Sequence, residues 1–229
     1  MAERALLLIA DIGGYTQFMR LHRLSLAHSG EVTGRLLDAA IEAAPELELV
    51  GIEGDAAFLC AFDDEGRAAP TVADTSIAMH RAFHEKQQEI AANTLCPCEA
   101  CAQVGSLRLK FVAHAGEVAQ QRIGNRTSLV GLDVIAVHRM LKNSVPVPEY
   151  LLVSDAVYER LDRALRERAT TITEELEGIG ETPLYFVDLG EIAGDLPEPP
   201  EPSVAGRIRE TATVLGRGVP YLLGLKSRS

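Results

Sequence analysis

The chain has 229 residues and a formal net charge of −11, from 22 Lys and Arg against 33 Asp and Glu. With 47% apolar and 24% charged residues, it has the composition of a soluble globular protein, long enough for one domain of roughly 200 residues and a tail. The acidic balance, without clustered Lys or Arg, argues against nucleic acid or an anionic membrane as partner. The apolar run 5–10 is too short for a membrane span or a signal-peptide core, so we expect a cytoplasmic protein.

The first part of the chain predicts a strand, helical segments and a hairpin. Residues 5–10 form a short apolar run, typical of a buried strand. Apolar residues recur at helical spacing over 15–44, until Pro45 ends the pattern. Strands are expected at 48–50 and 56–62, on either side of a glycine-rich turn.

The remainder alternates helices and strands. We expect a helix at 72–90, a strand at 107–114, a hairpin at 118–128, a helix at 133–141, a strand at 150–153, a helix at 155–168 and a strand at 184–189. Because hairpins occur among the interleaved elements, we predict an α+β fold with an antiparallel or mixed sheet covered by helices.

The C-terminal part differs in composition from the rest. Residues 193–203 are rich in proline, which is typical of an extended linker. We therefore predict a main domain over 1–192, with a cysteine-rich loop at 93–105, and an appendage over 204–229 that contains a strand at 219–225.

Asp11 and Asp55 are the most informative pair of polar residues. Each adjoins a predicted strand and lies beside glycine. If the first strand pairs with the hairpin, both carboxylates project from one edge of the sheet, where they repel unless a hard cation such as Mg²⁺ or Mn²⁺ separates them. The neighbouring glycines leave room for a phosphate chain to approach the backbone. The alternative is that both are ordinary turn aspartates.

Several segments, in order, resemble the class III adenylate and guanylate cyclase catalytic domains. The first two are Asp11–Thr16, similar to the opening Asp-Ile-x-Gly-Phe-Thr motif, and Gly51–Ala56, similar to the Lys-x-x-Gly-Asp hairpin. The others are Leu109–Val118, Gly131–Met140, Leu151–Tyr158 and Gly178–Leu184. The resemblance covers about residues 5 to 190.

This resemblance implies a ferredoxin-like cyclase fold and a head-to-tail homodimer with active sites at its interface. It also implies two divalent metal ions, Mg²⁺ or Mn²⁺, that bind a nucleoside triphosphate and promote attack of the ribose 3′-hydroxyl on the α-phosphate. The metal positions correspond to Asp11, with Ile12 beside it, and Asp55. The nucleotide positions correspond to Gly13, Gly14, Tyr15, Thr16 and Ser128, and the catalytic arginine corresponds to Arg139.

Two positions depart from the cyclase pattern. The lysine that reads the purine is Gly51 here, and the asparagine that holds the ribose is Ile135. The residues expected to bind metal match the cyclase pattern, whereas those expected to select a purine base do not. The hypotheses are therefore a divergent cyclase that forms a cyclic nucleotide, an inactive nucleotide-binding and metal-binding signalling dimer, and an interaction scaffold.

Cysteines and histidines provide the remaining candidates. Cys96, Cys98 and Cys101 are spaced to hold one soft ion such as Zn²⁺, although a fourth ligand is missing; redox sensing and free thiols are the alternatives. His80 and His84 are spaced for chelation, but with no third ligand nearby we expect them on a helix surface. His114, on a buried strand, is expected to be a hydrogen-bonded core residue.

Overall fold

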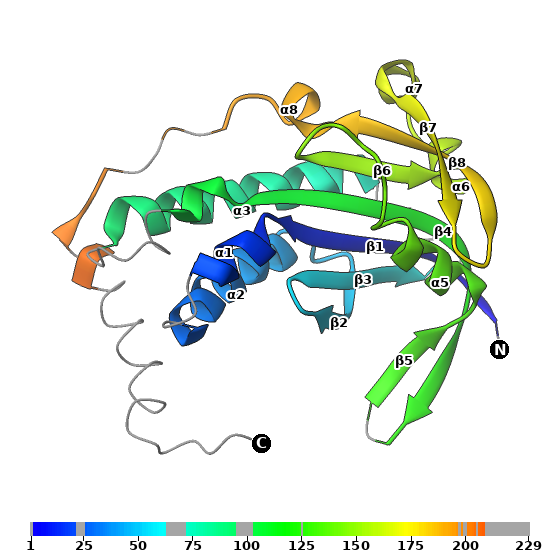
Figure 1. The fold of residues 1–229 in the computed structure, drawn as a ribbon, viewed down its shortest axis with the longest axis horizontal. Helices are drawn as coiled ribbons and strands as arrows, with labels where there is room; N and C mark the ends of the chain where they lie inside the picture. The colour runs from blue at the N-terminus through cyan, green and yellow to red at the C-terminus, as the bar shows by residue number, and fades with distance from the viewer. Residues whose placement is uncertain are drawn as a thin grey trace.

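The computed structural model describes residues 2–21, 26–62, 72–94, 103–124, 126–196, 198, 201–204 and 206–208. Its centre is an eight-stranded sheet of these residues (Figure 1). The strands are β1 (Glu3–Gly13), β2 (Glu48–Glu53), β3 (Ala56–Phe62), β4 (Arg108–Ile123), β5 (Arg126–Val130), β6 (Tyr150–Ser154), β7 (Thr170–Leu176) and β8 (Gly180–Asp188).

The strand order is β2-β3-β1-β4-β6-β8-β7, and β5 pairs with β4 outside this path. Among the described strands, β4 and β6 are parallel and the other paired strands are antiparallel. The end of β4 and β5 form an arm that projects from the sheet (Figure 1). This arrangement confirms the predicted α+β class with a mixed sheet.

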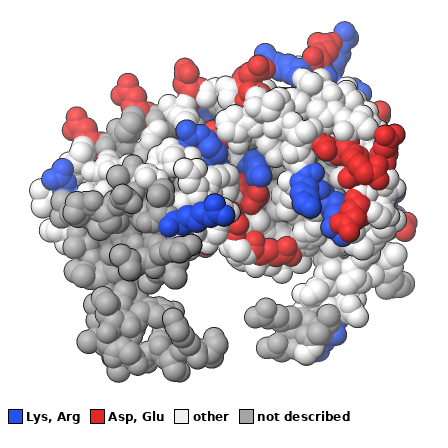
Figure 2. All heavy atoms as spheres, in the orientation of Figure 1, with Lys and Arg blue, Asp and Glu red and all other residues white. Residues whose placement is uncertain are grey.

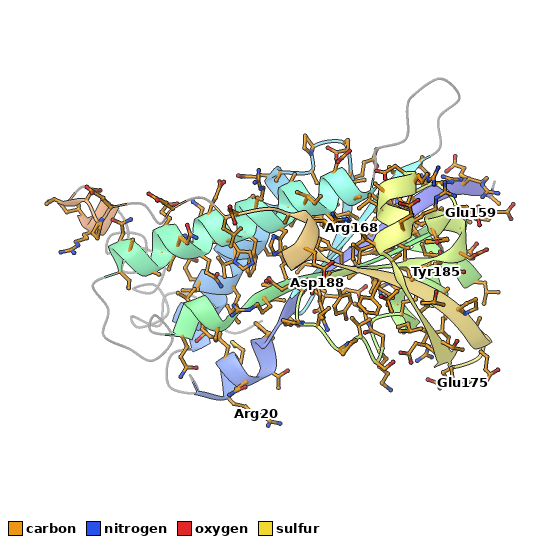
Figure 3. All side chains as sticks on the ribbon, turned by 90° about the horizontal axis from the view of Figure 1, so that it is seen from above. Arg20, Glu159, Arg168, Glu175, Tyr185 and Asp188 are labelled. Atoms are coloured by element: carbon orange, nitrogen blue, oxygen red, sulfur yellow. The ribbon has the colours of Figure 1, made fainter. Side chains whose placement is uncertain are left out.

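Helices cover both faces of the sheet. They are α1 (Tyr15–Leu21), α2 (Leu26–Glu42), α3 (Val72–Asn93), the 3₁₀ helix η1 (Val104–Ser106), α5 (Leu132–Arg139), α6 (Asp155–Tyr158), α7 (Arg163–Arg168) and α8 (Leu189–Ile192). The first three of these pack on one face, where α3 runs along the sheet (Figure 3), and α5 packs on the other. None of the helices in the described part of the chain has the length and apolar character needed to cross a bilayer.

The central strand β1 explains this two-sided packing. Leu6 and Leu8 point to the face covered by α2 and α3, whereas Leu7 and Ile9 point to the face covered by α5. A strand that is buried on both faces needs a nearly continuous apolar run, which is why residues 5–10 show no polar alternation. The run ends where Asp11 reaches the edge of the core.

Two elements differ from the sequence-based expectation. The helix expected over 155–168 is divided into α6 and α7, because Asp162 caps a new helix by accepting a hydrogen bond from the Leu165 N–H at 2.9 Å. The edge strand β7 was not expected, since its alternation of exposed threonine and glutamate is weak in apolar character. The strand expected at 219–225 lies outside the described residues.

The described part of the C-terminal region lies against α3. Arg81 of α3 donates hydrogen bonds to the carbonyls of Ala193 and Asp195, and the Ser203 N–H donates to Asn93 Oδ1 at 3.2 Å. The domain boundaries at 192 and 203 remain predictions. Acidic and basic side chains lie interspersed over the described residues of the face in Figure 2.

Candidate functional site

The two candidate metal ligands come from neighbouring strands at the same end of the sheet. Asp11, near the end of β1, is in register with Ala56 at the start of β3, and Asp55 lies in the turn just before Ala56. The Ile12 N–H donates a hydrogen bond to the Asp55 carbonyl at 3.3 Å. Gly54 makes the turn possible, because its φ of 68° is in the left-handed region. The folded chain therefore brings both half-buried aspartates together.

Lys110 is the cation beside this pair, and its role was not predicted from the sequence. It is in register with Asp11 on β4, and its Nζ lies 3.0 Å from Asp11 Oδ2. Burial alone would lower the pKa of Lys110, but the charge of Asp11 and its hydrogen bond, with contributions from Tyr150 and Asp55, raise it above its ordinary value. The residue therefore stays charged.

The pKa of Asp55 is raised, first by burial and then by the like charge of Asp11. Asp11 is thus paired with the ammonium group of Lys110, whereas burial and the charge of Asp11 disfavour the charged form of Asp55. A hard divalent cation placed between the two carboxylates would relieve this repulsion.

The turn between β1 and α1 carries the four expected nucleotide positions. Gly14 has a φ of 85°, and its carbonyl accepts the Phe18 N–H at 3.0 Å, which starts α1. Gly13 lies close to β4, since an added Cβ would be 3.4 Å from the Cβ of Arg108. Tyr15 packs against the core and Thr16 is exposed. The turn directly follows Asp11, so any group bound there would be close to the aspartate pair.

Arg139 and Ser128 lie on other parts of the molecule. Arg139 ends α5, and its Nη1 lies 2.7 Å from Glu177 Oε2 in the turn between β7 and β8. α5 also contacts β1, and the residue before Arg139, His138, lies 3.4 Å from Glu53 Oε2 at the end of β2. Ser128 is on the β5 arm, in register with Gln121. Within one chain, then, the observed contacts of these two residues do not lead to the aspartate pair.

His114 is hydrogen-bonded as expected, but it is partly buried, with 15% of its side chain exposed. Its Nδ1 is 2.7 Å from Ser154 Oγ, and its Nε2 is 2.9 Å from Asp133 Oδ1. The second oxygen of Asp133 accepts the Glu117 N–H at 2.6 Å. This network fixes the start of α5 on β4, because Asp133 belongs to the first turn of that helix.

The cysteines divide into two groups. Cys96, Cys98 and Cys101 lie outside the described residues, so the metal site expected there stays a prediction. Cys60 is buried in β3, where burial and the charge of Glu48 raise the pKa of its thiol to about 11. It is an inert core thiol.

His80 and His84 are the main correction to the sequence-based interpretation. Both were expected on a helix surface, yet they are 3% and 5% exposed and face the sheet. A third possible ligand, Glu149, directly precedes β6, and one ligand atom from each of the three residues lies within 4.8 Å of the others. The histidine spacing was visible in the sequence, but the distant glutamate was not.

The fold is that of the class III nucleotidyl cyclase catalytic domain. The guanylate cyclase domain of RhGC from Catenaria anguillulae, solved in complex with GTP, superposes with a TM-score of 0.55 at 18% identity, over 82% of this chain and 97% of that one. The adenylyl cyclase CyaB from P. aeruginosa gives 0.53 at 13% identity, over 87% and 98% of the two chains. These likenesses establish the fold.

The sequence comparisons identify a narrower family. Residues 32–150 match the model described as "Protein of unknown function (DUF2652)". The chain is 41% identical, over 193 residues, to the "Uncharacterized protein Rv2561/Rv2562" of Mycobacterium tuberculosis (strain ATCC 25618 / H37Rv), which covers 84% of this chain and 89% of that protein. The chain therefore belongs to the DUF2652 family and has a class III cyclase fold.

Proposed function

We propose that this protein binds a nucleoside triphosphate together with Mg²⁺ or Mn²⁺ at Asp11 and Asp55. The observation that carries the proposal is the convergence of these two carboxylates from β1 and the β2–β3 turn, at the end of the sheet where Gly13 and Gly14 follow. The GTP complex of a domain with the same fold supports a nucleotide as the ligand class.

The residues fit a hard divalent cation. Carboxylate oxygens from Asp11 and Asp55, with the backbone carbonyl of Ile12, would provide an all-oxygen donor set of the kind Mg²⁺ and Mn²⁺ prefer. The pKa of Asp55 is raised first by burial and then by the like charge of Asp11, and Lys110 offsets this only in part. Phosphate oxygens and water would complete the coordination, which explains why so few protein ligands suffice.

The residues of this chain suggest how a bound triphosphate would be held. Asp11 and Asp55 would hold the ions, and bound ions would supply Lewis-acid chemistry by withdrawing charge from the phosphates and acidifying the ribose 3′-hydroxyl. Lys110 places a fixed positive charge beside them. Backbone N–H groups of the glycine turn, with Tyr15 and Thr16, line the approach. In a cyclase, attack of that hydroxyl on the α-phosphate expels pyrophosphate.

We assign Arg139 and Ser128 to the neighbouring subunit's active site. In its own chain Arg139 pairs with Glu177 and Ser128 lies on the β5 arm, and a dimer would bring the partner subunit's Arg139 to the phosphates. Exposed apolar residues on three neighbouring elements support such a dimer. The elements are α5, β5, which contacts α5, and β2, which contacts β5. The residues are Leu49, Ile52, Val130, Leu132 and Ile135. Such side chains are suited to cover one another in a second copy of this chain.

A specific observation favours the second candidate function, binding without turnover. Ile135 is 48% exposed on α5 and offers no hydrogen bond to a ribose, while Gly51 has no side chain to read a base. Losing a transition-state donor typically costs about 2.7–4 kcal/mol. A nucleotide-binding signalling dimer with weak base selectivity, or a scaffold, would need neither contact.

Calorimetric titration with Mn²⁺ and ATP tests the site. Asp11→Asn and Asp55→Asn should each weaken Mn²⁺-dependent ATP binding at least tenfold, because one carboxylate ligand is lost in a nearly isosteric change. Asp38→Asn, on the exposed side of α2, is the matched control and should bind as the wild type does. Unchanged binding in either site variant would exclude the shared metal. Mass spectrometry for a cyclic product then separates the cyclase from the binder.

A further inference from the structure

A second polar cluster lies on the other face of the sheet from Asp11. His80 and His84 are one turn apart on α3, and both imidazoles face Glu149. Glu149 Oε1 lies 2.7 Å from His84 Nε2 and 3.3 Å from His80 Nε2. The side chain of Glu149 is only 17% exposed, so three ionisable groups are gathered inside the protein.

Gln87 places a proton on Nδ1 of His84. The Gln87 amide nitrogen donates to the carbonyls of Val104 and Leu107, at 2.7 and 2.9 Å, so its orientation is determined. Its oxygen must then accept a hydrogen bond from His84 Nδ1, at 2.9 Å. With a proton on Nδ1, His84 directs Nε2 at the Glu149 carboxylate, 2.7 Å away. A proton shared by these two atoms satisfies both, and a metal ion bound to both would take its place.

His80 gives a second indication. Its ring is 3% exposed, and neither nitrogen makes a well-aligned hydrogen bond among the described residues, although Nε2 lies 3.3 Å from Glu149 Oε1. Leaving a buried polar group unsatisfied is costly, and such groups in native proteins call for an explanation such as a bound ion. The His80 ring lies edge-on to the His84 ring with centroids 4.5 Å apart, so the two imidazoles can bind the same ion.

The donor set is that of a transition-metal site, and its ligand atoms lie within 4.8 Å of one another. Two imidazole nitrogens and one carboxylate oxygen are common ligands of Zn²⁺, which binds them at 2.0–2.2 Å; in a tetrahedral site such ligands lie about 3.4 Å apart. The separations are 3.3 Å for His80 and 2.7 Å for His84, so an ion would need His84 and Glu149 to move apart by about 0.7 Å. The hydrogen bond from His84 Nδ1 to Gln87 is the outer contact that orients a metal-binding histidine. Mg²⁺ and Ca²⁺, which prefer oxygen, do not suit two imidazoles.

We propose that His80 Nε2, His84 Nε2 and Glu149 Oε1 bind one first-row divalent transition-metal ion, Zn²⁺ in particular, with solvent as a further ligand. The ion would connect α3 to the strand edge, because Glu149 Oε1 also accepts the Leu109 N–H of β4 at 3.0 Å. Gln87 would connect the site to η1, because its amide nitrogen also donates a hydrogen bond to the Val104 carbonyl. The site is independent of the aspartate pair and of the proposed nucleotide.

Metal content and Co²⁺ spectroscopy of the full-length protein test this site. Purified protein, stripped with a chelator and then titrated with Co²⁺, should bind one equivalent here with visible d–d bands that Zn²⁺ abolishes. Glu149→Gln, nearly isosteric, should weaken Zn²⁺ binding at this site more than tenfold. Gln87→Ala should weaken it by about 10–100-fold, as expected for loss of an outer contact. His138→Ala, a histidine on α5, is the matched control and should leave it unchanged.

A combined Cys96→Ser, Cys98→Ser and Cys101→Ser variant separates this site from any metal on sulfur. We expect it to keep one equivalent of Co²⁺ and to lack thiolate-to-cobalt charge-transfer bands in the near ultraviolet. If this variant binds no Co²⁺ or Zn²⁺, or if Glu149→Gln in that background binds as tightly as its parent, the proposal is wrong. Circular dichroism of each variant establishes that it is folded.

Discussion

At the scale of single residues, Lys110 controls the charge at the aspartate pair. Its ammonium lies 3.0 Å from Asp11 and must be displaced or shared when a divalent cation binds. Two unit charges 4 Å apart interact by about 4 kcal/mol at an effective dielectric constant of 20, and partial exposure reduces this figure.

Lys110→Gln should therefore strengthen Mn²⁺ binding to the nucleotide-free protein by about tenfold at low salt, equivalent to roughly 1.4 kcal/mol. The same variant should weaken triphosphate binding, since one positive charge beside the phosphates is lost. Calorimetry measures both, with the exposed Lys142→Gln as control. Equal or weaker Mn²⁺ binding in Lys110→Gln would contradict this assignment.

Cys60 provides a prediction about reactivity and pH. Raising the thiol pKa from 9.0 to about 11 reduces the thiolate fraction at pH 8 by roughly a hundredfold, and the thiolate is the nucleophile. Native protein treated with iodoacetamide at pH 8 should leave Cys60 unlabelled, and labelling should accelerate as the pH approaches 11. Peptide mass spectrometry follows the residue, with guanidinium-unfolded protein as the reference. Equally fast labelling in native and unfolded protein would contradict the burial.

The residues that sequence reasoning could locate are those with local signals. Asp11 and Asp55 lie beside glycine turns, so their position at strand ends could be predicted. Lys110 could not be assigned, because its contact with Asp11 depends on the register between β1 and β4. Glu149 contributes its carboxylate to a histidine 65 residues earlier in the chain, which no spacing rule connects.

At the scale of elements, the junction between β4 and α5 depends on Gly116. A Cβ at this position would lie 2.2 Å from Asp133 Cγ, so the Asp133 carboxylate would have to move. It would then lose its contacts with His114 and with the Glu117 N–H. A close approach of this kind is visible only after the helix has been placed on the strand.

Gly116→Ala should lower the free energy of unfolding by about 1–3 kcal/mol, the usual cost of overpacking. Gly34→Ala is the matched control: Gly34 lies within α2, has open space around it, and should become more stable by about 0.5–1 kcal/mol when replaced by alanine. Guanidinium denaturation measures both. A Gly116→Ala protein as stable as the wild type would show that Asp133 is not held as described.

The elements themselves were predictable where periodicity is strong. The long helix over 72–93 and strand β1 follow from their apolar patterns. The division between α6 and α7 was missed because it depends on Asp162, which caps a new helix where the apolar pattern predicts that one helix continues. β7 was missed because an edge strand needs few apolar side chains.

At the scale of the whole molecule, the apolar residues on α5 and β2 predict self-association. Leu132 is 65% exposed and Ile135 is 48% exposed, which is costly unless they are covered. Leu132→Asp and Ile135→Asp should each convert a dimer to a monomer in analytical ultracentrifugation. Leu196→Asp, an equally apolar but separate exposed position, should leave the dimer intact. A wild-type protein that is monomeric throughout the micromolar range would contradict the dimer.

Strand β4 passes between the two candidate ion sites. The Leu109 N–H binds Glu149, while the next residue, Lys110, binds Asp11 on the other face. If both ions bind, thermodynamic linkage applies: the factor by which Zn²⁺ changes the affinity for Mn²⁺ must equal the factor by which Mn²⁺ changes the affinity for Zn²⁺. Such coupling would arise most simply if binding at one site moved the peptide bond between residues 109 and 110, because residue 109 contacts Glu149 and residue 110 contacts Asp11. Titrating Mn²⁺ into zinc-free and zinc-loaded protein measures it, and a factor of one would mean that β4 keeps the two faces energetically separate.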